Sequence, residues 1–197
     1  QLLSWLDTSV IGGSAQETGL LFHGSLFRDS PKIRKVTETY FRVNDVDLAY
    51  HPDWPALSNL DTTIYLNNSG VYSEGGIARV LESEISNARV HIPIPFGKAP
   101  TTVSIVADVQ GPLMDGIKVL NETPIAEQIS DVALNWSGTG SFVGNLKLDI
   151  PLGLSANREV YSNISVSLYD NDIQFPEYDI AVSDLQGIFK YENFSGL

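Results

Sequence analysis

GSFVGNLKLDIPLGLSANREVYSNISVSLYDNDIQFPEYDIAVSDLQGIFKYENFSGL, residues 140–197, is the stretch that decides the fold class of this chain. Apolar and polar residues alternate in 142–150 and again in 160–168, which is the period of a half-buried strand. The apolar sets are Phe142, Leu146, Leu148 and Ile150, then Val160, Ile164, Val166 and Leu168. Turn-forming residues at 151–157 separate the runs and predict a hairpin. A tight corner at 170–172 and short strands beyond it extend the pattern into an antiparallel meander.

A second hairpin lies upstream, in residues 88–94 and 101–109. One side of each run is aliphatic, and the loop at 95–100 holds two prolines and a glycine. The alternating apolar residues are Val90, Ile92 and Ile94 in the first run and Val103, Ile105, Ala107 and Val109 in the second. Further strands are predicted around 18–27, 37–50 and 60–66. In 37–50 the apolar residues change parity after Asn44-Asp45, which a turn or a bulge would explain.

Two short helices complete the expected structure. The apolar spacing of residues 1–11, followed by Gly12-Gly13, indicates one. Thr123-Pro124 followed by Glu127 has the cap, first-turn proline and acidic residue of a second helix start. The sequence therefore predicts a mainly β, antiparallel and strongly twisted sheet with one or two short helices.

The whole chain, residues 1–197, is expected to form a single β-rich segment. Ser58-Asn59-Leu60 and Ser183-Asp184-Leu185 each precede a similar mix of large apolar and polar residues, which is a weak internal repeat. The boundary between sub-repeats is expected near residues 120–135.

Composition and charge narrow the function classes. Twelve basic and 24 acidic residues give a net charge of −12, which argues against a nucleic-acid partner and against attraction to an anionic membrane surface. There is no cysteine, so neither a disulfide framework nor the usual structural zinc site is available. No run is as long as the roughly 18 apolar residues of a membrane span, and any anchor or export signal is expected outside this sequence.

The sequence contains no motif that indicates catalysis. His23, His51 and His91 lie far apart and show no metal-ligand spacing. Residues 170–172 resemble the opening of a calcium loop, but the glycine and glutamate required later are missing. No nucleophile elbow, phosphate loop or distinctive carboxylate pair occurs. We predict no catalytic residue, no metal site and no cofactor.

The main feature left to explain is the large one-sided apolar sheet. It could close on itself as a β-sandwich and bury that face, or it could leave the face partly open as a groove suited to acyl chains. Strand parity assigns eight residues to such a groove: Val90, Ile92, Val103, Ile105, Leu146, Leu148, Ile164 and Val166.

The order of several short motifs resembles the middle region of the YhdP branch of the AsmA-like, bridge-type lipid transfer family. The resemblance spans nearly the whole chain, and the W-P-x-L and L-x-I-P-L pieces are its most specific parts. The motifs are Trp5-Leu6, residues 19–26, Leu48-Ala49-Tyr50, residues 54–57, Pro124 with its short helix, residues 146–152 and residues 185–197.

This resemblance implies a lipid transport function in the cell envelope. Family members are long proteins anchored in the inner membrane of Gram-negative bacteria, and their repeated β modules form a hydrophobic groove across the periplasm. The sheet of this chain is accordingly expected to form an open groove, with a closed β-sandwich as the alternative. The chain would then be a periplasmic segment that shields phospholipid acyl chains, and its partners would be phospholipid, other modules of the same long chain and envelope proteins. The family has no catalytic motif to transfer.

Two other classes remain open. One is a non-catalytic scaffolding module of the bacterial envelope with a closed sheet. The other is a carbohydrate-binding sandwich using Tyr50, Trp54 or Trp136, whose positions at strand ends and turns provide no obvious platform.

Overall fold

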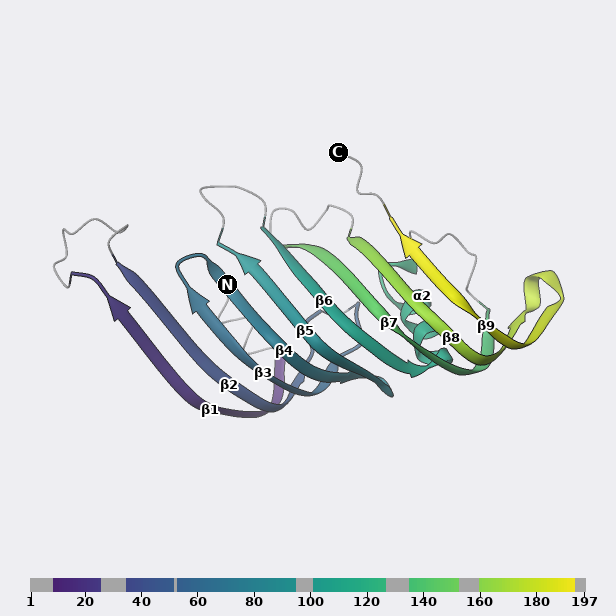
Figure 1. Ribbon diagram of the computed structural model, residues 1–197, viewed down its shortest axis with the longest axis horizontal. Helices are drawn as coiled ribbons and strands as arrows, with labels where there is room; N and C mark the ends of the chain where they lie inside the picture. Colours follow the sequence, from purple (N-terminus) through teal and green to yellow (C-terminus); the bar gives the residue numbers. More distant parts are fainter. Residues whose placement is uncertain are drawn as a thin grey trace.

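A computed structural model describes residues 9–25, 35–51, 53–94, 101–126, 135–152 and 160–193. It holds one nine-stranded antiparallel sheet in which every strand pairs with its neighbours in sequence, in the order β1 to β9 (Figure 1). The strands are β1 (Val10–His23), β2 (Val36–Leu48), β3 (Leu57–Asn67), β4 (Gly70–Val80), β5 (Ser83–Pro93), β6 (Thr101–Pro112), β7 (Ser137–Leu152), β8 (Tyr161–Phe175) and β9 (Ile180–Glu192).

The sheet is not closed into a barrel. β1 and β9 are its two edges, and they lie at opposite ends of the molecule in Figure 1. Among the described residues there is no second sheet to pack against it. The mainly β, antiparallel prediction is therefore confirmed, and the closed sandwich is not what forms.

A line of β-bulges bends the sheet. Eight of the nine strands hold a residue with a left-handed backbone, and register shifts accompany these residues. They are Glu17, Asp45, Asn59, Gly75, Asn87, Gly140, Asp170 and Asp184. Such residues increase local twist and bend the strand, so the lower ends of the strands turn to the far side of the sheet in Figure 1.

The line of β-bulges explains two features of the sequence. The parity change at Asn44-Asp45 is a bulge, as expected, with Asp45 at φ 52°. Asn59 and Asp184, the central residues of the weak repeat, both have left-handed backbones. The repeated motif therefore marks equivalent bends in β3 and β9.

The helix α2 (Leu113–Glu122) follows β6 directly and packs on one face of the bent sheet. Leu113 and Ile117 form a buried cluster with Ile173 of β8. The partly buried side chains packed against the cluster are Trp136, Leu168, Phe175 and Leu185. The face that α2 contacts is called the apolar face below, and the opposite one the polar face.

Three details differ from the expectations or lie beyond them. α2 was not predicted, because its N-cap is Pro112, without a capping side chain. The Thr123 helix start is described only as far as residue 126, where the Ile125 N–H donates to Thr123 Oγ1; the rest lies outside the described residues, as does nearly all of the helix expected at 1–11. The corner predicted at 170–172 is wrong, because β8 continues to Phe175 through a bulge at Asp170.

Candidate functional site

The strand register places all eight predicted groove residues on the apolar face. In antiparallel strands, directly paired residues point to the same side. One row runs from Val90 through Ile105 to Leu148, because these residues pair in turn across β5, β6 and β7. A second row joins Leu146 to Ile164, and Val166 pairs with Gly144 one step lower in β7. Parity adds Ile92 and Val103 to the same side.

The same face extends over residues that the sequence prediction omitted. Ile92 pairs with Val71, which pairs with Leu66 of β3, and Ile64 pairs with Phe41 of β2. At the other end, Phe189 pairs with Val166 and Tyr191 with Ile164. The alternation Ile64, Leu66 and Phe41, Val43 was visible in the sequence and could have added them.

No charged side chain occupies the apolar face in the paired, described parts of the nine strands. Hydroxyl groups interrupt it, more often in the first four strands than in the last five. In the strand parts above the line of bulges in Figure 1, the residues that carry these hydroxyl groups are Thr18, Thr37, Thr39, Thr62, Ser73, Ser162 and Tyr191. The Oγ atoms of Thr62 and Ser162 are buried without a hydrogen-bond partner, which is unfavourable for folding.

Charged groups gather on the polar face and pair there. Lys147 Nζ lies 3.7 Å from Asp149 Oδ2 and 5.4 Å from the centre of the Tyr161 ring. The Asn87 amide donates to Asp108 Oδ2 at 2.7 Å, and the Gln110 amide to Glu84 at 2.8 Å. From β5 to β8 the two faces therefore differ in chemistry.

The apolar face is only partly covered by protein. Of the eight predicted residues, Leu148 is buried, at 7% exposed, and the other seven are half-buried. Removing apolar surface from water is favourable by about 25 cal/mol per Å². A half-exposed row of aliphatic side chains therefore favours contact with hydrocarbon over contact with water. The arrangement can therefore hold acyl chains, and the described strands place no charged side chain on this face.

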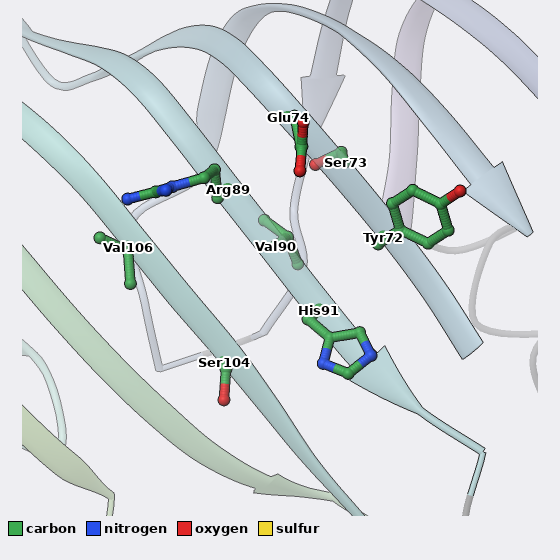
Figure 2. Close-up of a pocket in the computed structure, with 8 residues that line it drawn as sticks. All are labelled: Tyr72, Ser73, Glu74, Arg89, Val90, His91, Ser104 and Val106. Carbon is green, nitrogen blue, oxygen red and sulfur yellow. The ribbon is translucent and has the colours of Figure 1, made fainter. Parts of the chain in front are cut away.

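The polar face carries a recess of about 310 Å³ between β4, β5 and β6 (Figure 2). Tyr72, Arg89 and His91 line it, together with Glu74 and Ser104. Glu74, Arg89 and His91 are exposed to solvent, and in Figure 2 their side chains do not converge on one point. Ser104 Oγ donates a hydrogen bond to Asp149 Oδ1, and this contact involves none of the charged side chains that line the recess.

Metal and carbohydrate chemistry gain no support. In the described ranges, no three His, Asp or Glu side chains group to hold a metal ion. Trp136 packs edge-on against Phe175 at 4.8 Å inside the α2 cluster, so its ring is not a free platform. Tyr50 and Trp54 lie 6.5 Å apart after β2, and burial raises the pKa of Tyr50.

Within the part of the chain that the structure describes, no helix is long and apolar enough to cross a membrane.

Comparison with known proteins gives one consistent relationship. The family model described as "YhdP protein" matches residues 1–196. The intermembrane phospholipid transporter YhdP of Escherichia coli (strain K12) is 26% identical over 198 residues, which is 98% of this chain. The chain spans 15% of the length of that relative. No solved structure is significantly similar to it.

Proposed function

Because the chain belongs to the YhdP protein family, we propose that it is a periplasmic segment of a bridge-like lipid transport protein. In this proposal its apolar face shields phospholipid acyl chains as they pass between the inner and outer membranes. The segment belongs to a protein anchored in the inner membrane of a Gram-negative bacterium, and other modules of the same long chain continue the groove on either side. The segment itself catalyses no reaction.

The observation that carries the proposal is the one-sided apolar face, which protein covers only in part. Four paired strands supply its centre, where Val90, Ile105 and Leu148 form one continuous row. A purely structural sheet would gain stability by covering such a face, since burial of apolar area is the main favourable term in folding. The phospholipid transport stated in the name of the Escherichia coli relative supplies a ligand that would cover it.

Movement along this face would need no energy from the segment. The rows of aliphatic side chains run across neighbouring strands, so an acyl chain moving from strand to strand exchanges one apolar contact for a similar one. No charged side chain in the described strands interrupts that path. The zwitterionic or anionic head group remains in water, where it pays no desolvation cost.

The sharpest test replaces one residue on each face of the same strand. Ile105→Asp puts a carboxylate in the centre of the apolar face, whereas Val106→Asp puts it on the polar face. Val106 is half-buried like Ile105 and pairs with Arg89 and Lys147, so a carboxylate there gains two cationic neighbours. The two variants therefore carry the same added charge in opposite surroundings.

The measurement is native mass spectrometry with lipid extraction on protein purified from bacterial membranes and periplasm. We expect phospholipid with the wild type and with Val106→Asp, and loss of it with Ile105→Asp while circular dichroism shows a retained β fold. Wild-type protein that is reproducibly free of lipid would contradict the proposal and favour a scaffolding module of the envelope.

A further inference from the structure

The helix α2 closes the lower end of the apolar face. Gly116 lies against the ring of Phe142, where an added Cβ would be 3.4 Å from the ring edge. Phe142 is only 8% exposed, and it pairs with Leu168, which packs on the buried α2 cluster. Both residues continue the face that holds Leu146 and Val166. Figure 1 shows α2 at the lower ends of β7 and β8.

A fixed anchor holds the start of the helix in this place. Asp115 Oδ2 accepts hydrogen bonds from the Glu82 N–H at 2.9 Å and from Ser83 Oγ at 2.7 Å. These donors belong to the turn between β4 and β5 and to the start of β5. The helix is therefore tied to the sheet on one side by its carboxylate and on the other by the Leu113 and Ile117 cluster.

The apolar wall above α2 has a definite depth. In β7 it runs from Gly144, just above Phe142, to Ile150, which is a rise of about 20 Å at about 3.4 Å per residue. The hydrocarbon of one membrane leaflet is about 15 Å deep, half of the roughly 30 Å core. A phospholipid with its chains parallel to the strands would thus fit between the upper end of the sheet and the helix.

We propose that α2 is a stop that limits how deeply acyl chains enter, so that this segment selects phospholipids by chain length. The inference rests on the proposed lipid function and adds a residue-level limit to it. Each methylene that reaches the wall should raise affinity about fourfold, the equivalent of about 0.8 kcal/mol. Methylenes beyond the stop stay in water or bend back, and they should not raise the affinity further.

Gly144 provides the place to move the stop. It has no side chain, and Val166 leans over it from β8, with Cγ1 2.8 Å from the position of an added Cβ. Val109 flanks it from β6. Val166→Phe or Val109→Phe would place a ring over the bare glycine directly above α2, much as the Tyr40 ring lies over Gly19 on the polar face. Ile150→Phe adds the same bulk at the upper end and is the matched control.

The experiment incubates the 197-residue chain with vesicles of phosphatidylcholines mixed in equal amounts, from dilauroyl to diarachidoyl, and identifies the bound species by mass spectrometry. We expect enrichment to rise with chain length and then stop in the wild type and in Ile150→Phe, and to stop at shorter chains in both lower variants. Two such variants guard against one failing to fold.

Two results would overturn the inference in different ways. If enrichment continued to the longest chains, or if the lower variants bound lipid with an unchanged limit, the stop would be refuted and the lipid function would stand. If the wild type bound no chain length at all, the proposed function itself would fail and this inference with it.

Discussion

Removing the Asp115 carboxylate should loosen the helix from the sheet by a measurable amount. It accepts two hydrogen bonds, from the exposed Glu82 N–H and from Ser83 Oγ. Glu82 can bond to water instead, so we assign its bond only about 0.5 kcal/mol, and Ser83, which is 6% exposed, about 1.5 kcal/mol because its lost acceptor is not easily replaced. Asp115→Ala should therefore lower the free energy of unfolding by about 2 kcal/mol.

Thermal unfolding followed by circular dichroism would measure this effect. A loss of that size corresponds to a Tm lower by about 4–8 °C for a domain of this length. A double-mutant cycle with Ser83→Ala isolates the side-chain pair, and a coupling of about 1 kcal/mol is expected. Asp115→Asn retains an acceptor oxygen and should lose less. Independent, additive effects of Asp115→Ala and Ser83→Ala would refute the reasoning, because the two groups would then not act on each other.

Two further predictions concern the bend at Asp45 and the phenol of Tyr50. Asp45 has φ 52°, and its Oδ1 accepts from the Asn59 amide, so Asp45→Val should cost about 2 kcal/mol or more in urea unfolding while Asp45→Gly costs under about 1 kcal/mol; equal costs would contradict a role for the left-handed backbone. Burial raises the pKa of Tyr50, so the folded state holds this proton more tightly than the unfolded state. The resulting stability is complete below the ordinary phenol pKa of about 10 and declines above it, and Tyr50→Phe should show a flatter alkaline decline in a pH series of urea unfolding than the wild type does.

The strands and their apolar side were readable from the sequence because the signal is local. Val103 and Ile105 alternate with polar neighbours, and alternation fixes which side chains share a face. The bulge at Asp45 was also readable, since a bulge shifts that alternation by one residue. Asp170 shows the limit of this approach, because the same residue types favour a left-handed backbone in a turn and in a bulge.

The helix was not readable for a different reason, and the open shape was expected only from the family resemblance, not from the residue pattern. Leu113 and Ile117 are spaced for a helix, but Gly116 and the missing cap weaken the local signal, and tertiary packing on Ile173 provides the stabilisation. An open and a closed sheet bury alternate residues in the same pattern, so the alternation of Leu146 and Leu148 cannot distinguish them. That difference depends on whether the two edge strands, β1 and β9, pair with each other or stay apart.

Contact between lipid and the apolar face is the central claim, and site-specific photo-crosslinking tests it most directly. A photoreactive amino acid would replace Ile105 or Leu148 on the apolar face, and Val106 or Lys147 on the polar face, in protein produced in Gram-negative cells. We predict phospholipid adducts in the mass spectra of the first two variants and none in those of the last two. Equal labelling from both faces, or adducts from the polar face alone, would contradict the account.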